Sequence, residues 1–306
     1  MEYLFSIAGR DELWSGGMLI ESRASHGQAR CRGTEIDAAD LADPHLIERA
    51  ESRMTVMRAL AREMSDARVR LVASARRVND YERDEASMSI TVGGVSVVTT
   101  SEHARTDFPS PRRSVEKVTH AGLPILWRNG SAAVLLHEAA GHAAEHDHKT
   151  DWPSWLTIRD EPDFAIDDAG NETRAVDLMH EPPACMRRES FRDVPLPRMT
   201  SLIARQQDAP WSMPDDRIEI HLIGGGAYEP LTGMVTVSVA VADVVHGDDV
   251  TPLAPFRIHV ARDRVARAIA GAAGDPLRYP GVVCVREGQE VAVGSFAPLM
   301  ITMELM

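Results

Sequence analysis

The chain has 306 residues, enough to bury a substantial core in one large domain or in two of ordinary size. Hydrophobic residues make up 44% and charged residues 26%, as is typical of a globular protein. Acidic residues outnumber basic ones by 46 to 33, for a formal net charge of -13, and the lysines and arginines are scattered. This balance argues against nucleic acid as a partner.

The N-terminal residues, MEYLFSIAGRDELW, lack the basic start and the long apolar run of a signal peptide. No apolar run approaches the roughly 18 residues that a membrane helix needs. The three cysteines, Cys31, Cys185 and Cys284, are an odd number, which argues against a disulfide framework. We therefore expect a cytoplasmic protein with no membrane partner, in which a cysteine is buried filler, a nucleophile or a metal ligand.

In the first part of the chain, residues 43–67 place apolar side chains near one helical face, and Asp43 is a suitable start. This pattern predicts an amphipathic helix. From residue 68 to residue 100, β-branched runs predict strands of a mainly antiparallel sheet, with Gly93-Gly94 as a bulge or turn.

Prolines and charges at residues 105–113 are typical of a connection between domains. We therefore place an N-terminal α/β domain at residues 1–115 and a second domain at residues 116–306. The second begins with a strand and turn in LPILWRNG, continues into an Ala- and Leu-rich helix, and is then rich in strands, with a helix at residues 265–273. The expected fold is α+β, a mainly antiparallel sheet with a few packed helices, and no GxGxxG or P-loop opposes this.

The segment LLHEAAGHAAEHDHK, residues 135–149, places His137 and His142 five positions apart. Residues four apart lie about 40° from each other around an α-helix, whereas residues five apart diverge by about 140°. The two imidazoles could not share a metal ion on a straight α-helix. A π-bulge would return them to one face, and Gly141 has the backbone freedom for it. The spacing predicts a bulged or broken helix at residues 140–142 if the segment binds metal, and an ordinary helix if it does not.

On the functional interpretation, His137 and His142 are neutral ligands of Zn²⁺, and Glu138 takes a proton from a metal-bound water. On the alternative interpretation the histidines face solvent or pack in the interior. The local pattern leaves both open, because short motifs also occur by chance.

Nearby, His146 and His148 lie in a polar stretch and are expected to be solvated. Glu145 either orients a ligand histidine or lies on the surface. A catalytic zinc ion normally has three protein ligands, and this segment supplies only two. Any other Asp, Glu, His or Cys could be the third, and spacing alone does not choose among them.

Five blocks in the second part of the chain are informative together: AAVLLHEAAGHAAE; LTIRDEP with FAIDDAGNETRAVDL; RRESFRDVPLPRMTSL; GGGAYEPLTGMVTVSV; and GVVCVREGQEVAVGSFAPLMIT. The first resembles the HExxxH segment of the TldD and PmbA (TldE) metalloprotease family, in particular its metal-carrying TldD branch. The other four resemble later blocks of that family in the same order. Together they cover roughly residues 123–305.

The resemblance implies that His137, His142 and Cys284 bind Zn²⁺ and that Glu138 is the catalytic residue. Two imidazoles and one thiolate leave about one net positive charge, which polarises a water and a scissile carbonyl. The expected architecture is thus an HExxxH motif on a distorted helix within an α+β fold.

Four residues are candidates for substrate binding. Gly224, Gly225 and Gly226 form either a turn or a strand along which an extended peptide adds to the sheet. Arg198 either binds a substrate carboxylate or carbonyl, or pairs with a nearby acid.

Two departures from the family pattern are visible. Ser201 follows RMT where the family usually has Asn, and only 136 residues precede His137, so the N-terminal region is shorter than in the family. In the family this region helps to form a dimer around the active site. We expect a homodimer, or a heterodimer with a PmbA/TldE-like subunit.

The leading hypothesis is a zinc metallopeptidase that hydrolyses unfolded or linear peptides. A second is a zinc-stabilised subunit that binds a peptide or a partner without cleaving it. A third is a zinc hydrolase that acts on some other amide.

Overall fold

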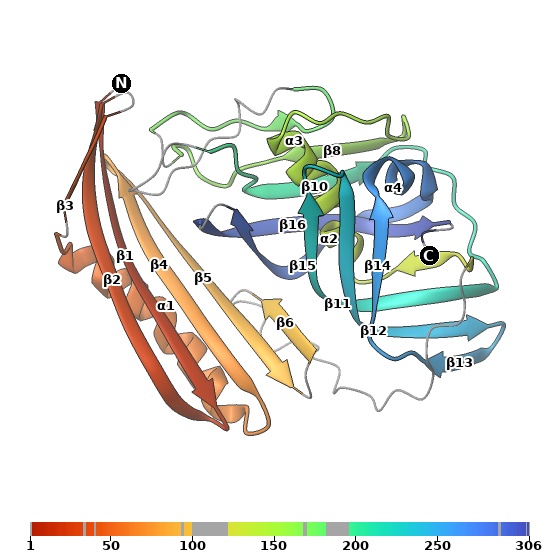
Figure 1. The fold of residues 1–306 in the computed structure, drawn as a ribbon, viewed down its shortest axis with the longest axis horizontal. Helices are drawn as coiled ribbons and strands as arrows, with labels where there is room; N and C mark the ends of the chain where they lie inside the picture. Colours follow the sequence, from red (N-terminus) through yellow and green to blue (C-terminus); the bar gives the residue numbers. More distant parts are fainter. Residues whose placement is uncertain are drawn as a thin grey trace.

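Two β-sheets make up most of the molecule, one from each part of the chain (Figure 1). The computed structural model describes residues 2–32, 35–39, 41–92, 95–99, 122–167, 170–181, 196–286, 289–303 and 305. The expected connection at residues 105–113, and with it the proposed domain boundary after residue 115, lies outside these residues. No helix within the described ranges is long and apolar enough to cross a membrane.

The N-terminal sheet has six antiparallel strands in the order β3-β2-β1-β4-β5-β6. The strands are β1 (Glu2–Ser15), β2 (Met18–Arg32), β3 (Glu35–Ala39), β4 (Arg68–Val78), β5 (Tyr81–Val92) and β6 (Val95–Thr99). Every second residue of β4 from Val69 to Ala75 is buried, as expected of a strand with one covered face. The predicted strands are confirmed, whereas Gly93-Gly94, between β5 and β6, lie outside the described residues.

Helix α1 (Pro44–Glu63) covers one face of this sheet (Figure 1). Asp43 caps its N-terminus, because its carboxylate accepts hydrogen bonds from the backbone amides of His45 at 3.0 Å and Leu46 at 3.3 Å. On the apolar side, Met57 is completely buried against the strands. The expected amphipathic helix is confirmed, although it ends a few residues early.

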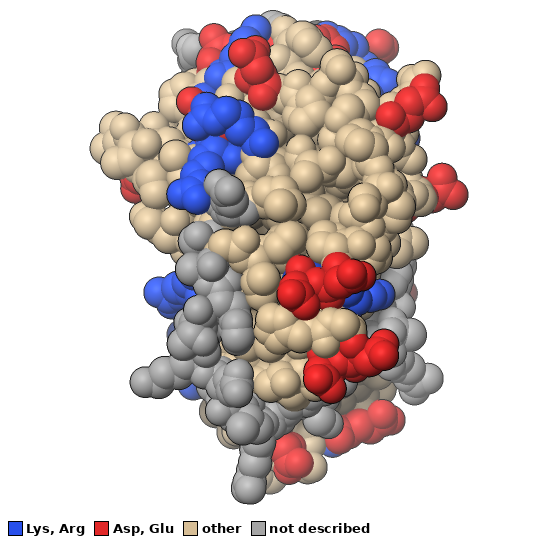
Figure 2. Space-filling view, turned by 90° about the vertical axis from the view of Figure 1, so that its right-hand side faces the viewer, with Lys and Arg blue, Asp and Glu red and all other residues tan. Residues whose placement is uncertain are grey.

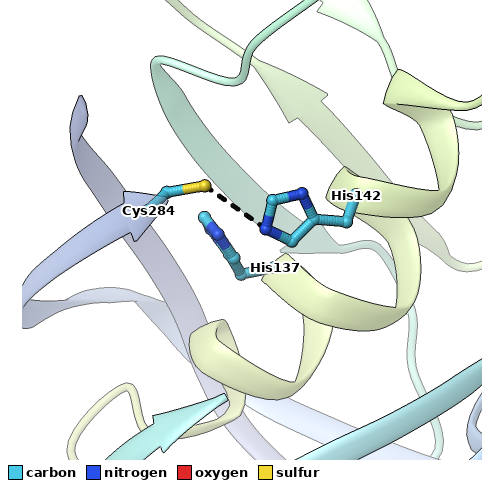
Figure 3. Close-up of side chains that lie close together, drawn as sticks. All are labelled: His137, His142 and Cys284. Carbon is cyan, nitrogen blue, oxygen red and sulfur yellow. Dashed lines mark hydrogen bonds between the residues drawn. The ribbon is translucent and has the colours of Figure 1, made fainter. Parts of the chain in front are cut away.

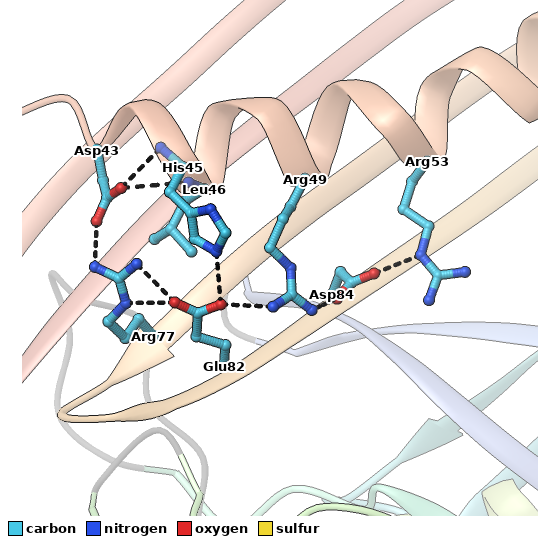
Figure 4. A network of polar contacts seen from close by, with 8 residues as sticks. All are labelled: Asp43, His45, Leu46, Arg49, Arg53, Arg77, Glu82 and Asp84. Carbon is cyan, nitrogen blue, oxygen red and sulfur yellow. Dashed lines mark hydrogen bonds and ion pairs between the residues drawn. The ribbon is translucent and has the colours of Figure 1, made fainter.

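An ion-pair network joins α1 to β4 and β5 (Figure 4). Its members are Asp43, His45, Arg49, Arg53, Arg77, Glu82 and Asp84. The carboxylate of Glu82 accepts hydrogen bonds from Arg49 at 2.6 Å and from Arg77 at 2.7 Å. Burial alone would raise the pKa of Glu82, but the hydrogen bonds from Arg77, His45 and Arg49 outweigh it and lower the pKa to about 2.

A second polar cluster is buried between α1 and the sheet. Glu12 is only 2% exposed, yet its carboxylate accepts hydrogen bonds from Trp14 Nε1 at 3.0 Å and from Arg58 Nη2 at 2.5 Å. Burial acts to raise the pKa of Glu12, but the bonds from Arg58 and Trp14 outweigh it and lower the pKa. This carboxylate therefore stays ionised as part of the structure.

The second sheet contains ten strands, eight of them in the order β13-β12-β11-β7-β16-β10-β8-β9, with β14 paired to β12 and β15 paired to β16. The strands are β7 (Ile125–Trp127), β8 (Leu156–Asp160), β9 (Val176–Asp177), β10 (Ser201–Gln206), β11 (Asp216–Glu229), β12 (Met234–His246), β13 (Asp249–Pro252), β14 (Phe256–Ala261), β15 (Ile269–Arg286) and β16 (Gln289–Thr302). Among the strand pairs that the structure describes, only β7–β11 and β10–β16 are parallel. The α+β fold with mainly antiparallel sheets is confirmed.

A helical segment, residues 132–145, packs against β10, β11, β12, β15 and β16 and occupies the core of this half (Figure 1). Next to it, Trp127 is completely buried and donates a hydrogen bond from Nε1 to Oγ1 of Thr302 at 2.9 Å. The helix that carries the histidines is therefore held from several sides.

The helix expected at residues 265–273 is wrong in its bounds. The structure has α4 at Arg262–Ala268, and the chain continues as β15 from Ile269. Ile269 pairs with Thr302 of β16, and Gly271 pairs with Ile301. Pairing with a long neighbouring strand outweighs the weak helix preference of a short Ala-rich stretch.

The face of the N-terminal sheet opposite α1 meets the second half of the chain. The guanidinium of Arg83 lies 4.3 Å from the ring centre of Phe164, and β6 lies beside β11 and β15. Figure 2 shows the face at the right of Figure 1, where acidic and basic side chains lie in small separate groups.

Candidate metal centre

The two candidate histidines lie on a helix that contains a π-helical turn. The segments α2 (Ala132–Leu136), η1 (His137–His142) and α3 (Ala143–Glu145) follow one another without a break. A π-helix has more residues per turn than an α-helix, so residues five apart reach the same side. The rings of His137 and His142 are perpendicular, with centres 4.9 Å apart. The distortion that the spacing predicts for a metal-binding segment is present.

Gly141 has a role other than the backbone freedom expected from the sequence. It belongs to the regular π turn, so no unusual backbone angle requires glycine there. A Cβ at this position would lie 1.7 Å from the sulfur of Met199, which is completely buried. The missing side chain leaves a notch that Met199 fills.

The candidate ligand atoms of His137, His142 and Cys284 all lie within 4.8 Å of one another, and the three side chains point toward one another (Figure 3). The histidines come from the helix and Cys284 comes from β15. Sγ of Cys284 is 3.3 Å from Nε2 of His142, close to the separation of about 3.5 Å between sulfur and nitrogen ligands of a tetrahedral zinc ion. This donor set suits zinc rather than magnesium or calcium.

A carboxylate orients His142. Nδ1 of His142 is 2.8 Å from Oε2 of Glu145, and Glu145 is 3% exposed. Of the two roles left open for Glu145, the contact matches the orienting one. Burial alone would lower the pKa of His142, but the hydrogen bonds with Cys284 and Glu145 outweigh it and raise the pKa to about 11. A metal ion would therefore have to take the place of the proton on Nε2.

Arg198 does not lie where a substrate could reach it, so its proposed role in substrate binding is wrong. Its side chain is completely buried, and Nη2 donates hydrogen bonds to the carbonyl oxygen of Cys284 at 3.0 Å and to Sγ at 3.1 Å. A sequence pattern does not show burial, and an arginine in a Pro-rich block looks exposed.

His137 and Glu138 have buried atoms without a hydrogen-bond partner among the described residues, Nδ1 and Oε2 respectively. These side chains are 1% and 4% exposed, and buried polar atoms are normally paired. Burial, with the charges of His142 and Arg198, lowers the pKa of His137 well below its usual value, so its ring is neutral. Burial raises the pKa of Glu138 to about 7. Both atoms are therefore left able to take a hydrogen bond or a metal ion that the described residues do not supply.

These groups line a pocket of about 450 Å³. The glycines Gly224 to Gly226 form part of its wall and belong to β11, so of the two roles considered the turn is wrong. A Cβ on Gly226 would lie 2.5 Å from Oε1 of Glu138. Glycine at this position lets the strand pass directly beside the carboxylate.

Beside this pocket, one edge of β11 has no partner strand among the described residues. β12 pairs with β11 along its whole length, whereas β7 pairs with the other edge only at residues 218–220. The hydroxyl of Tyr279 then bonds both the N–H and the C=O of Ile223, at 2.7 and 3.0 Å. From Gly224 onward, none of the strands that the structure describes pairs with this edge.

His146 and His148 stay outside the ligand group found among the described residues. His146 lines the pocket, and Nδ1 of the exposed His148 is 2.7 Å from the hydroxyl of Tyr228. The whole of Cys185 and the side chain of Cys31 lie outside the described part of the chain.

The sequence patterns do not predict Tyr279 or Arg286 as site residues. Arg286 lines the pocket and donates from Nη1 to the carbonyl oxygen of Pro197 at 2.9 Å and to Glu145 at 3.3 Å. A signal was available for Arg286, because it lies two residues after Cys284 and alternate residues of a strand share a face.

Three solved structures share this fold over nearly the full length of the chain. TldE from Thermococcus kodakarensis has a TM-score of 0.56 at 10% identity, covering 99% of this chain and 95% of that one. A candidate modulator of DNA gyrase from Thermotoga maritima has a TM-score of 0.54 at 10% identity, covering 98% and 96%. A similar candidate from Bacteroides thetaiotaomicron has a TM-score of 0.51 at 11% identity, covering 99% and 94%.

No protein-family model matches the chain, and no curated protein matches its sequence. At such low identity the structural likeness establishes the fold. The TldD/PmbA resemblance of the sequence blocks is therefore confirmed at the level of the fold. The expected shortening of the N-terminal region stays a prediction.

Proposed function

We propose that this protein is a zinc-dependent peptidase that hydrolyses unfolded or linear peptides. The observation that carries this proposal is the buried group of His137, His142 and Cys284, with ligand atoms within 4.8 Å of one another. Beside it lies Glu138, whose Oε2 has no hydrogen-bond partner among the described residues. A carboxylate next to a three-ligand metal centre in a pocket is the arrangement that metal-assisted hydrolysis needs.

His137, His142 and Cys284 are the residues that would hold the ion. When bound, zinc supplies Lewis-acid chemistry, polarising a carbonyl and easing the loss of a proton from water. Glu145 holds the ring of His142 in place, since their contact is 2.8 Å. The protein thus fixes the orientation of a ligand through a buried hydrogen bond.

Glu138 acts first as a base and then as an acid. Its Oε2 accepts a proton from the attacking water and passes it to the leaving amine. The carboxylate is 4% exposed, which limits competition from bulk water. Gly226 leaves room for it, because any larger residue would place a Cβ 2.5 Å from Oε1.

The edge of β11 that has no partner strand among the described residues is the proposed substrate-binding surface, with Gly224, Gly225 and Gly226 as its central residues. Main-chain groups at a strand edge pair with the main chain of an extended peptide whatever its sequence. Because the edge runs along the pocket that contains Glu138, a peptide bound there passes the reacting groups. Such binding favours unfolded or linear substrates over folded proteins.

The assembly and location are also part of the proposal. We propose a cytoplasmic dimer, either a homodimer or a heterodimer with a PmbA/TldE-like subunit, on the strength of the sequence resemblance and of the fold shared with TldE. Light scattering of the purified chain, alone and mixed with such a subunit, measures the molar mass. A monomer under both conditions would contradict the dimer.

Elemental analysis of protein purified without added zinc tests the metal site. We expect about one zinc per chain, and loss of the metal in His142→Ala and in Cys284→Ala. His148→Ala is the matched control and should keep the metal, because this exposed histidine lies outside the ligand group. Full occupancy in both ligand variants would contradict the proposal.

Cleavage of a fluorogenic unstructured peptide tests the activity. A chelator should abolish cleavage and added zinc should restore it, while Glu138→Gln should keep the metal and lose the cleavage. If the zinc-loaded protein, alone and with a PmbA/TldE-like subunit, leaves such peptides intact, a zinc-stabilised subunit without peptidase activity becomes the better explanation.

A further inference from the structure

We infer that Arg198 is a positioning residue for the sulfur ligand Cys284, and that it acts through a short brace that also positions the histidine ligand. The brace is the segment of residues 197–201. This inference rests on the proposed metal centre and goes beyond it, because Arg198 supplies no ligand atom and is completely buried.

On the sulfur side of the site, one guanidinium nitrogen makes two contacts. Nη2 of Arg198 donates to the carbonyl oxygen of Cys284 at 3.0 Å and to its Sγ at 3.1 Å. Because the same nitrogen holds both atoms, it restricts rotation of the cysteine side chain. An arginine is always protonated, so it also brings a positive charge to the sulfur of Cys284, a residue that is 4% exposed.

On the histidine side, the next residue of the brace reaches the helix. The backbone N–H of Met199 donates to Oε1 of Glu145 at 2.8 Å, and Oε2 of the same carboxylate is 2.8 Å from Nδ1 of His142. The side chain of Met199 fills the notch at Gly141. Of these two consecutive residues, Arg198 thus contacts the ligand Cys284 directly, and Met199 acts on the ligand His142 through Glu145.

The brace is itself anchored at both ends. Oδ1 of Asp160 accepts hydrogen bonds from the backbone amide of Thr200 at 2.9 Å and from that of Ser201 at 2.7 Å. At the other end, Nη1 of Arg286 donates to the carbonyl oxygen of Pro197 at 2.9 Å. The protein therefore sets the position of the brace with its own hydrogen bonds.

A role for Arg198 limited to pairing with Glu145 fits the distances less well. Its Nε lies 3.8 Å from Oε1 of Glu145, whereas Nη2 lies 3.1 Å from the sulfur. Burying a guanidinium completely is costly. The closer contact is the one to the proposed ligand.

Zinc affinity measures the contribution of Arg198. The metal-free full-length protein is titrated with Zn²⁺ against a chromophoric chelator, and in parallel with Co²⁺ to record the sulfur-to-cobalt absorption band. We expect Arg198→Met to weaken zinc binding about 10- to 100-fold and to shift the band. Arg198→Lys keeps the charge and should recover part of the zinc affinity and part of the wild-type position of the band. Arg205→Met, which removes an exposed arginine paired with Glu161, is the matched control and should change neither.

Circular dichroism melting of the metal-free proteins identifies any variant that does not fold. Glu145→Gln then provides a second test of the brace, because it acts through His142 and has nearly the same size as the original residue. We expect about tenfold weaker zinc binding from this variant with the sulfur-to-cobalt band retained.

Wild-type zinc affinity in both Arg198 variants would overturn the inference and leave the metal centre intact. Weaker binding with an unchanged cobalt spectrum would also overturn it, because the effect would then not involve the sulfur. Failure of the wild-type protein to bind either metal stoichiometrically would overturn the proposed function, and the inference with it.

Discussion

Two buried glutamates, one in each half of the molecule, have opposite surroundings. Glu12 is 2% exposed and Glu138 is 4% exposed, so both carboxylates are almost completely removed from water. Glu12 accepts hydrogen bonds from Trp14 and Arg58, and its pKa is lowered. Oε2 of Glu138 lies 3.8 Å from Nε2 of His142 but has no hydrogen-bond partner among the described residues, and burial raises the pKa of Glu138 to about 7.

The difference separates a structural carboxylate from one available for chemistry. The N-terminal half compensates its buried charge with an arginine on the packed helix α1 and needs nothing further. In the second half, a carboxylate oxygen of Glu138 and an imidazole nitrogen of His137 have no hydrogen-bond partner among the described residues, next to a thiol and a second imidazole. Unsatisfied buried polar groups are costly, so two of them on adjacent residues, beside side chains that can bind a metal ion, indicate a ligand.

Among substitutions of the two buried glutamates, the largest expected effect is on catalysis. Glu138→Gln should lower kcat for peptide cleavage by about 10²- to 10⁴-fold, because the amide cannot accept the proton. Zinc content, measured by elemental analysis, should stay at the wild-type level. Retained turnover at full zinc occupancy would exclude Glu138 as the base.

The matched substitution in the N-terminal half should act on stability. Glu12→Gln removes the more buried of the two carboxylates that pair with Arg58, the other being Glu51, and breaks its charged hydrogen bonds; it should reduce the free energy of unfolding by about 3 kcal/mol. Glu138→Gln, in metal-free protein, should change it by less than about 1 kcal/mol, because no hydrogen bond is broken at Oε2. Urea denaturation of both variants measures the two changes in the free energy of unfolding. Equal losses would show that pairing does not distinguish the two sites.

The next largest effect is a loss of stability on filling the notch at Gly141. Gly141→Ala places a methyl group where the sulfur of Met199 lies and should reduce the free energy of unfolding by about 2 kcal/mol. In a Met199→Ala background the same change should cost less, because the notch is then empty. Denaturation of the two single variants and the double variant measures this coupling. Additive losses would contradict direct packing at the notch.

The smallest effect concerns acid stability. Because the pKa of Glu82 is lowered in the folded protein to about 2, its stabilisation is present above the unfolded pKa of about 4.3 and is lost as pH falls toward 2. The side chain is 21% exposed, so the contribution is only about 1 kcal/mol. Glu82→Gln should flatten the fall in stability between pH 4.5 and 2, relative to wild type. An unchanged acid slope would rule out this role.

The elements and the helix distortion could be predicted from local patterns, because periodicity and histidine spacing are properties of neighbouring residues. The five-residue spacing of His137 and His142 predicts the π turn, and the β-branched runs predict most strands. Cys284 follows only from the family resemblance, since no local spacing connects it to the helix. The pairing of strands in the sheet brings Cys284 next to the helix, although the two are far apart in the sequence.

Contacts made through burial could not be predicted. Arginine is a residue type usually found on the surface, yet Arg198 is completely buried against Cys284. Glycine is usually taken to indicate backbone flexibility, yet Gly141 allows close packing with Met199. In both cases the partner is distant in sequence, so only the folded chain shows which atoms compete for the same space.

The π turn also has a consequence for insertions and deletions. An extra residue in an ordinary α-helix rotates everything that follows by about 100° and advances it by about 1.5 Å. Here the turn at His137–His142 absorbs one residue, so α2 keeps its buried contacts while Glu145 keeps its position beside His142. The helix thus tolerates a change in length at this one place, and a shorter motif with histidines four apart could occupy the same frame.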